Sequence, residues 1–579
     1  MTSSVRKIVM ITLGAALLIS IIIWGFSYMN NQETGAAQSE YNGHGGTFKN
    51  TLSPMDTPDP SVVYKDGYYY MTFTHNGTDI MVLKSRTIDF KQAQRKIVWL
   101  PDVGTAYSAE LWAPEIQWIQ GKWYIYFAAD DGLNENHRMF ALQADTEDPM
   151  GAYTFKGQIG DASDKWAIDG LVMEYKEKLY FVWSGWEGDV NERQNTYIAP
   201  MSDPLTISGE RVRLSTPDMD WEQAGGPPFI QEGQSILHHE DRVHIVYSGA
   251  GSWTPYYSLG MLSLKENGDP LSAADWVKAE KPLMTMNAKA SVYGPGHNSF
   301  TSSPDGRELW IVYHATSRED DGWNNRKARA AKVTWDENGN PLFGEPLSLR
   351  TAIHVPSGTG LYRPVAQEES PETLVIESVP SSVETNISTL IHYTNNTGKD
   401  ALLNVGIQDQ PFAQVSLPSV ETDGKGFAYV SVKMGNGLND LILDGLPAGV
   451  KVEAVEFPRY EAEDAQGKGD AETEENPYAS GTGIAVLPAD KASSINFSNV
   501  CVPVAGTYVL RIAAANSSGG KANVQVSVNG KDYELNLQST KRNQHLIHEL
   551  EVELNSGPNE IILEHAKHSV HMDYMDVSK

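Results

Sequence analysis

The chain has almost no cysteine. Cys501 is the single thiol among 579 residues, so no internal disulfide can form. A zinc site or a catalytic cluster built from cysteines is excluded for the same reason. No cysteine directly follows the apolar N-terminal run, which also excludes a bacterial lipoprotein anchor.

Positive charge is scarce as well. The chain carries 45 Lys and Arg against 74 Asp and Glu, which gives a formal net charge of -29. Proteins that bind nucleic acid neutralise phosphates with Lys and Arg, so this balance argues against such a partner and suits a neutral sugar better. The length exceeds what one core supports, and we expect about two to four domains.

Long apolar runs are limited to the N-terminus. Arg6 and Lys7 precede an apolar run from Ile8 to about Met29, and about 20 such residues span a ~30 Å hydrocarbon core as a helix. By the positive-inside rule we predict a transmembrane signal anchor over residues 1–29, with the remainder at the extracellular face of the cell membrane. A polar, flexible spacer follows over residues 30–49. The alternative is a cleaved signal peptide, with residues 35–37 as the small-residue site, and a secreted product.

Helical periodicity is scarce between residues 50 and 350. Instead, five segments such as "DPSVVYKDGYYYMTFT" each contain a short strand, a turn and a strand rich in aromatic and branched residues. Their starts lie roughly 54 to 65 residues apart, a period typical of propeller blades. The sequence therefore predicts an all-β chain with a five-bladed β-propeller over residues 50–365. A β-sandwich also repeats hairpins, but an unbroken series of five favours a closed ring, because closure hides strand edges.

The starts of the five segments carry the chemistry. They are Asp59, Ala113, Asp169, Glu232 and His297. First strands of propeller blades line the central channel, so these positions are expected to converge at one end of it. Each acid alone is explained by a turn or a cap, but three acids around one cavity are costly to desolvate and point to a site.

Paired carboxylic acids suit glycoside hydrolysis. One protonates the leaving oxygen, and a second, about 6.5 to 9.5 Å away when the anomeric centre inverts, activates water. A third acid can raise the pKa of the proton donor by charge repulsion. Aromatic faces could hold a sugar ring, although side chains of this kind more often pack in the core. The candidates are Trp112, Trp166, Phe229 and Trp253, of which Trp112 stands beside Ala113.

Four motifs in this order resemble glycoside hydrolase family 43. They are "DPSV", "WAIDGLV", "FIQEGQSIL" and "GPGHNSF", spread over about Pro54 to Arg350. The resemblance implies a five-bladed propeller in which Asp59 is the general base, Asp169 orients substrate and modulates pKa, and Glu232 is the general acid. It implies that His297 lies near a bound water or metal ion, and that no organic cofactor is needed.

Two further stretches resemble the exo-acting α-L-arabinofuranosidases of that family. They are "AELWAPEIQWIQGKWYIYFAADDG" and "NNRKARAAKVTWDENGNP". The resemblance implies an inverting hydrolase that releases terminal α-L-arabinofuranosyl residues from plant polysaccharides such as arabinan or arabinoxylan. Arg329 in the second stretch either contacts the substrate or pairs with an acid.

The C-terminal half begins after the linker "YRPVAQEESPET" and repeats itself. "MGNGLNDLILDG" matches "LNSGPNEIILEH", with Asn439 and Asn559 in equivalent places about 120 residues apart. We expect two β-sandwiches, over residues 371–458 and 459–579. The first is expected to be a spacer or a degenerate binding module.

The second sandwich resembles carbohydrate-binding modules of families 6 and 35. Its "YEAEDA" and "HMDYMDV" stretches imply a structural Ca²⁺ held by Glu461, Glu463 and Asp573, an all-oxygen set that suits this cation. The alternative is that the three acids face water. Two expected sugar contacts are altered, because the stretch before Asn516 lacks its tyrosine and His571 replaces an asparagine.

Other functions remain open at this point. A β-xylosidase or an endo-arabinanase of the same family, or a non-catalytic surface protein that binds polysaccharide, would share most of these features. A β-fructosidase is disfavoured because its W-M-N-D-P-N-G motif is missing. The sequence does not define the oligomeric state.

Overall fold

The computed structural model describes residues 47–579 except 92, 352, 365–371, 382–384, 421–423, 436, 477–478, 480–482, 490–491, 503–504, 542–543, 567 and 579. The predicted signal anchor and most of the predicted spacer lie outside these residues. Within them, no helix is both long enough and apolar enough to cross a membrane.

The prediction of an all-β chain is confirmed. The described residues form strands and four short 3-10 segments, with no α-helix among them. The 3-10 segments are η1 (Asn134–Asn136), η2 (Ala273–Asp275), η3 (Ala288–Ala290) and η4 (Ala462–Asp464). Runs of β-branched and aromatic residues favour this composition, and several of these segments, such as Tyr68–Thr72 and Lys122–Asp130, are buried on both faces.

Five antiparallel sheets follow one another along the chain, and their strands pair in sequence order, except that the last strand of sheet three, β14, pairs with β12. Sheet one holds β2 (Ser61–Lys65), β3 (Tyr68–Thr72), β4 (Ile80–Ser85) and β5 (Gln94–Trp99). Sheet two holds β6 (Ala109–Ile119), β7 (Lys122–Asp130), β8 (Arg138–Ala144) and β9 (Tyr153–Ile159). Sheet three holds β10 (Ala167–Tyr175), β11 (Lys178–Gly185), β12 (Asn195–Asp203), β13 (Thr206–Ile207) and β14 (Val212–Ser215).

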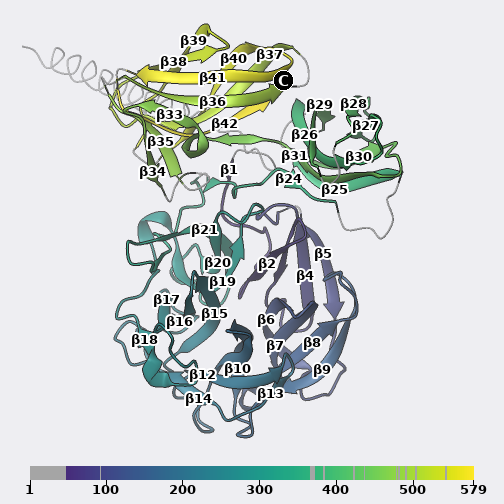
Figure 1. Cartoon of the computed structure of the whole chain (residues 1–579). Helices are drawn as coiled ribbons and strands as arrows, with labels where there is room; N and C mark the ends of the chain where they lie inside the picture. The colour runs from purple at the N-terminus through teal and green to yellow at the C-terminus, as the bar shows by residue number, and fades with distance from the viewer. Residues whose placement is uncertain are drawn as a thin grey trace, which may run out of the picture. The chain divides into compact units, whose positions relative to one another are not determined.

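The last two sheets complete the series. Sheet four holds β15 (Gln231–His239), β16 (Arg242–Gly249), β17 (Ser258–Leu264) and β18 (Trp276–Lys278). Sheet five holds β19 (Tyr293–Ser302), β20 (Leu309–Thr316), β21 (Lys327–Trp335) and β22 (Pro341–Leu342). Figure 1 shows the first strands β2, β6, β10, β15 and β19 gathered at the middle, with the later strands outside them.

The five sheets close into a ring. Each first strand contacts the first strand of the next sheet, and β19 contacts β2. Each of five apolar cores lies between two neighbouring sheets, including one between sheets five and one. Backbone bonds reinforce the closure, because the amides of Leu52 and Thr57 donate to the carbonyl oxygens of Ala328 and Arg326 near sheet five. Each first strand pairs only within its own sheet, and closure of the ring covers it with the first strands of both neighbouring sheets.

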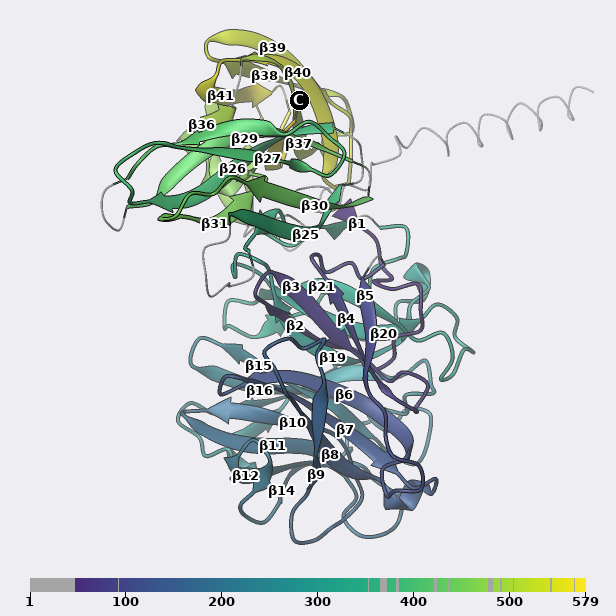
Figure 2. The same ribbon diagram turned by 90° about the vertical axis from the view of Figure 1, so that its right-hand side faces the viewer.

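The C-terminal part forms layered sheets (Figure 2). One sheet holds β25 (Thr373–Ser381), β30 (Gly437–Asp444), β27 (Ala401–Ile407) and β28 (Ala413–Leu417). Facing strands are β24 (Leu361–Tyr362), β31 (Val450–Glu456), β26 (Thr385–Asn395) and β29 (Gly426–Met434), and the two layers share one apolar core.

A second pair of layers follows. One layer holds β33 (Gln466–Gly469), β36 (Ser493–Val502), β41 (Gly557–Ala566), β38 (Ala522–Val528) and β39 (Lys531–Leu537). The other holds β32 (Arg459–Glu461), β34 (Glu472–Glu475), β35 (Gly483–Leu487), β37 (Gly506–Ala515), β40 (Leu546–Leu554) and β42 (Val570–Ser578). Pairing of Ile387 with Ser578 joins β26 to β42, so one continuous sheet contributes to both layered parts.

The internal repeat is visible in two buried asparagines. The side-chain nitrogens of Asn439 and Asn559 each donate to two carbonyl oxygens. One lies four residues earlier, and the other belongs to the residue that follows a bulge in the neighbouring strand, Val379 or Val500. Their side-chain oxygens accept from the backbone nitrogens of Gly435 and Asn555. The same residue type therefore fixes the same turn in both copies, as the repeat predicts.

Two segments belong to other parts of the fold than the predicted boundaries assign them to. Thr47 and Phe48, assigned to the spacer, form β1 (Thr47–Phe48) against β23 (Ile353–His354), and the Phe48 ring is buried. Strand β24, assigned to the propeller, pairs instead with β31. In both cases a short edge segment gains backbone hydrogen bonds that a free linker would leave to water.

Candidate active site

A left-handed residue stands near the start of the first strand of every sheet. At the corresponding positions φ is 58° for Asp59, 44° for Ala113, 55° for Asp169, 60° for Gly233 and 46° for His297. In sheets two to five the ladder skips two residues at this point. Bulges re-aim side chains, and a left-handed conformation in a non-glycine residue costs of order 1–3 kcal/mol. The same strained conformation recurs in four non-glycine residues, so the surrounding structure must offset its cost in each of these sheets.

This geometry corrects the predicted repeat by one residue. The position equivalent to Asp59, Asp169 and His297 is Gly233, and Glu232 stands one residue before it. A Cβ at Gly233 would lie 3.0 Å from the Cα and Cγ of His297, so close packing of the histidine requires a glycine here.

Backbone amides at the bulges tie neighbouring sheets together. The amide of Asp59 donates to Nδ1 of His314 at 3.0 Å, and that of Ala113 donates to the Thr74 hydroxyl at 2.8 Å. The amide of His297 donates to the Ser248 hydroxyl at 2.7 Å. Each acceptor belongs to the preceding sheet of the ring, so the bulge positions are held in register around a common centre.

His297 lies among three carboxylates. Its Nδ1 is 3.4 Å from Oδ1 of Asp59 and 3.8 Å from Oδ2 of Asp169, and its Nε2 is 3.4 Å from Oε1 of Glu115. Burial alone would lower the pKa of His297, but the carboxylates of Asp169 and Asp59 raise it to about 10. His297 is therefore favoured as an imidazolium, a form without a lone pair for a metal. A metal ion or water beside it remains a prediction.

Asp59 is surrounded by donors and positive charge. Thr74 donates its hydroxyl to Oδ2 at 2.6 Å, and the Arg326 guanidinium lies 3.3 Å from Oδ1. Burial raises the pKa of Asp59, but Arg326 and His297 outweigh it and hold that pKa well below its usual value. The carboxylate is therefore ionised at neutral pH.

Glu232 has the opposite environment. Burial and the negative charge of Asp169 raise the pKa of Glu232 to about 8, although His297 opposes the shift. The Tyr257 hydroxyl donates to Oε1 at 3.0 Å, which leaves Oε2 to carry a proton. Burial also raises the pKa of Asp169 to about 6, and its Oδ2 accepts from the amide of Gly233 at 2.8 Å. One acid holds a proton near neutral pH while another remains charged, the pattern of an acid and base pair.

His314 completes this surrounding. Burial and the Arg326 charge hold the pKa of His314 well below its usual value. Its Nδ1 accepts the Asp59 amide, so the neutral ring is the form that this bond needs. The ring also stacks on Tyr257 with centroids 5.7 Å apart, which links the surroundings of Asp59 and Glu232.

Comparison with known proteins identifies the family. The family model described as glycosyl hydrolases family 43 matches residues 48–341, about half of the chain. The chain belongs to this family.

Several relatives of this family 43 chain carry arabinofuranosidase names. An extracellular exo-α-(1→5)-L-arabinofuranosidase of Streptomyces avermitilis is 34% identical over 311 residues, which cover 52% of this chain and 64% of that protein. α-L-Arabinofuranosidase 43 of Humicola insolens is 33% identical over 53% of this chain and 67% of its own length. The match thus spans less than two thirds of the Streptomyces protein.

A solved structure shares the fold of the matched half. The α-L-arabinofuranosidase of Lactobacillus brevis is 32% identical, covers 52% of this chain and 98% of its own, and superposes with a TM-score of 0.50. The match covers about half of this chain.

The predicted aromatic residues lie in different surroundings. Trp112 is half-buried, stacks on His137 with centroids 4.0 Å apart and donates to the Glu110 carboxylate at 3.0 Å. Trp166 is buried and stacks on Trp186, so it belongs to the core. A sugar contact by Trp112 remains a prediction.

Phe229 and Trp253 are also half-buried. Phe229 lies 5.6 Å below the Arg193 guanidinium. Trp253 packs edge-to-face on Trp323, which is 61% exposed. No sequence pattern singles out Trp323, which stands directly before the stretch that contains Arg326 and Arg329.

The predicted arginine is displaced by three residues. Arg329 is fully buried, and its guanidinium donates to the Thr316 carbonyl and to the Ser317 hydroxyl. Arg326, just before β21, contacts Asp59. The pairing with an acid considered for Arg329 is thus made by Arg326, and direct substrate contact by Arg329 remains a prediction.

The predicted calcium ligands do not gather as expected. Among the described residues, the set within 4.8 Å that could hold a metal joins Asp573 to His354 and His545, and neither glutamate is part of it. Glu461 is buried on β32, and Glu463 accepts from the amide of Gly483 at 3.3 Å. A calcium ion at Glu461, Glu463 and Asp573 remains a prediction.

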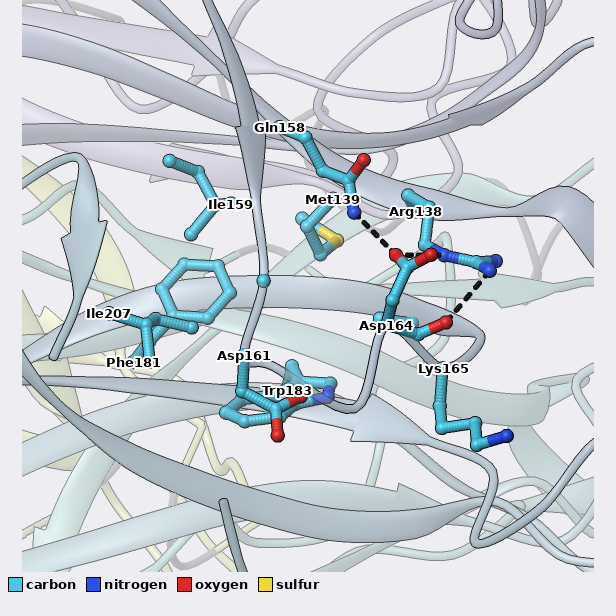
Figure 3. A pocket seen from close by; sticks show the side chains of 12 residues that line it. Arg138, Met139, Gln158, Ile159, Asp161, Asp164, Lys165, Phe181, Trp183 and Ile207 are labelled. Atoms are coloured by element: carbon cyan, nitrogen blue, oxygen red, sulfur yellow. Dashed lines mark hydrogen bonds and ion pairs between the residues drawn. The ribbon is translucent and has the colours of Figure 1, made fainter. Parts of the chain in front are cut away.

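A narrow cleft between sheets two and three has a different character (Figure 3). Its mouth carries Asp164, which accepts from Arg138 at 2.9 Å and from Gln158 at 2.8 Å. Its interior is lined by apolar side chains such as Phe181 and Ile207. The described residues that line it include none of the three acids, so it is not the cavity in which they meet.

Proposed function

We propose that the chain is an inverting, exo-acting α-L-arabinofuranosidase that removes terminal arabinofuranosyl residues from arabinan or arabinoxylan. The opposite pKa shifts of Glu232 and Asp59 around His297 carry this proposal. The names of the Streptomyces and Humicola relatives support the sugar and its anomeric form. The closed ring of five sheets supports the assignment of a five-bladed β-propeller with the acids at its centre.

In the proposed reaction, Glu232 is the general acid and Asp59 the general base. Asp59 takes a proton from water, whose oxygen attacks the anomeric carbon. The bond from that carbon to the leaving oxygen breaks, and the proton of Glu232 passes to that oxygen. Since the attack comes from the face opposite the leaving group, the product has inverted configuration. No organic cofactor takes part.

Asp169 is proposed to set the proton donor. Its negative charge raises the pKa of Glu232, since two nearby carboxylates resist double ionisation. The hydrogen bond from Gly233 to Asp169 fixes the spacing between the two acids. Protonation of Asp169 would weaken this effect, so both acids are expected to titrate as one coupled system.

The aromatic pair Trp253 and Trp323 is proposed to border the sugar site. Arg326 donates to the Trp323 carbonyl at 3.2 Å and also contacts Asp59, which connects the exposed ring to the general base. A flat apolar face suits the ring of a sugar, and burial of that face favours binding. Trp112 and Phe229 are proposed as further contacts.

A substrate panel tests the function. The purified protein should hydrolyse 4-nitrophenyl α-L-arabinofuranoside faster than 4-nitrophenyl β-D-xylopyranoside, and should release monomeric arabinose from linear arabinan. Proton NMR of the first product should show the β-anomer. Preference for the xyloside would indicate a β-xylosidase, and release of longer oligosaccharides an endo-arabinanase. First formation of the α-anomer would contradict inversion.

A non-catalytic polysaccharide-binding protein is the alternative from another class. It predicts binding of arabinan with no sugar released over long incubation. The separation of acid and base roles between Glu232 and Asp59 disfavours it, because binding alone has no need for a protonated glutamate beside an ionised aspartate. Residues 459–579 are proposed as a carbohydrate-binding module, and residues 1–29 as the membrane anchor.

A further inference from the structure

Two histidines and an aspartate form a second cluster, which shares no residue with the proposed active site. Nε2 of His354 lies 3.3 Å from Oδ2 of Asp573, and Nδ1 of His545 lies 3.5 Å from the same oxygen. One ligand atom from each of the three residues lies within 4.8 Å of the others. All three are buried, with exposed fractions of 8% for His354, 4% for His545 and 0% for Asp573.

Three separate elements supply these side chains. His354 ends β23, the strand paired with β1, and His545 directly precedes β40. Asp573 lies in β42 at a bulge, where Ala513 pairs with Tyr574 and Ala514 pairs with Met572. Asp573 is thus skipped by the ladder, and a bulge of this kind redirects the side chain it carries.

The spacing fits a metal better than a hydrogen bond. Ligands about 2.0 to 2.1 Å from a tetrahedral ion are about 3.3 Å apart, close to the separations of both histidine nitrogens from the aspartate oxygen. Charge-assisted hydrogen bonds are shorter, at about 2.7 to 2.9 Å. The ring of Tyr574 packs edge-to-face on His354 at 5.3 Å, which fixes the orientation of that imidazole.

The ligand chemistry selects the ion. Two imidazole nitrogens and one carboxylate oxygen suit Zn²⁺ and similar divalent transition metals. Ca²⁺ prefers six to eight oxygens, so this set would hold it poorly. Asp573 is the same residue that the sequence assigns to a calcium site with Glu461 and Glu463, and the two assignments predict different ions.

We propose that His354, His545 and Asp573 bind one divalent transition-metal ion, which we expect to be Zn²⁺. The ion joins the two-stranded sheet of β1 and β23, whose Phe48 and Ile353 pack in the core between sheets five and one, to the C-terminal layer of β40 and β42. It therefore acts as a structural crosslink between the catalytic half and the C-terminal half of the chain. Its ligands differ from the acids proposed for catalysis, so its test does not depend on the hydrolytic function.

Metal binding by the full chain tests the proposal. Chelator-treated protein is titrated with Zn²⁺ by calorimetry, and bound metal is counted by mass spectrometry after desalting. We expect one equivalent of Zn²⁺, no comparable binding of Ca²⁺ at this site, and a Zn²⁺-dependent rise in Tm, because a ligand that binds the native state stabilises it. Absence of bound Zn²⁺, or displacement of Zn²⁺ by an equal concentration of Ca²⁺, would overturn the site.

Variants assign the ligands. His354→Ala and His545→Ala should each weaken Zn²⁺ binding at least tenfold and lose the Tm rise. His392→Ala is the matched control, since His392 also pairs with a carboxylate, Glu456 at 2.6 Å, but lies on the other layered part. Retention of full Zn²⁺ affinity in both ligand variants would refute the assignment.

A spectroscopic measurement on the unaltered protein guards against variants that fail to fold. Co²⁺ loaded in place of Zn²⁺ should give the intense visible bands of a four-coordinate site and should be displaced by Zn²⁺. A weak, octahedral-type spectrum would contradict a histidine-rich site of low coordination number.

Discussion

The hydroxyl of Tyr257 donates a hydrogen bond to Oε1 of Glu232 across 3.0 Å. The G-P-G-H stretch makes this contact possible, because a Cβ at Gly296 would lie only 2.2 Å from the tyrosine ring. The glycine that precedes His297 by one position therefore positions the tyrosine that faces the proposed proton donor. The motif therefore supplies both His297 and, at Gly296, the space in which the Tyr257 ring packs.

Replacing Tyr257 by Phe should change the pKa of Glu232 while leaving the proposed general acid in place. The tyrosine hydrogen bond lowers the pKa of Glu232, so its loss should raise that pKa and move the alkaline limb of kcat/KM to higher pH. The rate at the optimum should fall by up to about tenfold, the usual scale for the loss of one hydrogen bond. A pH profile of Tyr257→Phe checks the shift. An alkaline limb at lower pH would contradict this role.

Glu232→Gln and Asp59→Asn should fail in different ways. Loss of the general acid should slow unactivated arabino-oligosaccharides by about 10²–10⁴-fold and 4-nitrophenyl substrates much less, because a good leaving group needs little protonation. Loss of the general base should slow both substrate classes alike, since water must be activated in either case. Steady-state kinetics on both classes decide this. Equal losses on both substrates in Glu232→Gln would exclude its acid role.

The pH dependence of the parent enzyme follows from the same shifts. The active form has Asp59 ionised and Glu232 protonated, so kcat/KM on an unactivated substrate should fall as pH rises through about 8. The acidic limb should lie far lower, because the pKa of Asp59 is held well below its usual value. Activity that keeps rising above that alkaline point would contradict the assignment of the proton donor.

His297→Gln should alter stability in a pH-dependent way. The pKa of His297 is raised from 6.5 to about 10 on folding, so the folded protein holds the extra proton more tightly than the unfolded chain. This contribution is fully present below about pH 6.5 and is lost as pH rises through about 10. The difference in Tm between the parent and the variant should therefore be largest at acidic pH and shrink on the alkaline side. A difference that grows with pH would show that His297 is not the cation among these acids.

Much of the site could be predicted because it is local in sequence. Asp59, Asp169, Glu232 and His297 each begin a hairpin with its own turn and alternation, and the period of the hairpins brings their starts together. The one-residue offset at Glu232 could not be predicted, because it depends on the bulge geometry and on the room that His297 takes at Gly233.

Arg326 shows a second limit of local reasoning. Arg326 and Arg329 stand in one stretch, and both are compatible with contact to an acid. The strand begins at Lys327, so Arg329 is enclosed between strands, while Arg326 remains in the preceding loop and reaches Asp59. The start of a strand is among the features that sequence patterns define least well.

The C-terminal half divides in the same manner. The equivalence of Asn439 and Asn559 could be predicted because each asparagine fixes a turn within four residues. The meeting of His354 with Asp573 could not, since their separation along the chain carries no periodic signal and depends on how β23 meets β42.

Substitutions at two equivalent bulges test whether a side chain at the left-handed position strains the backbone. Gly233→Ala adds a methyl group 3.0 Å from His297 at a φ of 60°, and should lower the free energy of unfolding by about 1–3 kcal/mol. Ala113→Gly is the matched control, because φ is 44° there and glycine relieves the strain. Relief of the strain at residue 113 should stabilise the fold by about 1–2 kcal/mol. The greater entropy of the unfolded chain opposes this by about 0.4–1 kcal/mol, so the free energy of unfolding should rise slightly or stay unchanged.

Denaturant unfolding measures the free energy of unfolding of both variants. If Ala113→Gly destabilised the protein as much as Gly233→Ala, the bulge would not be a site of backbone strain, and the glycine after Glu232 would need another explanation.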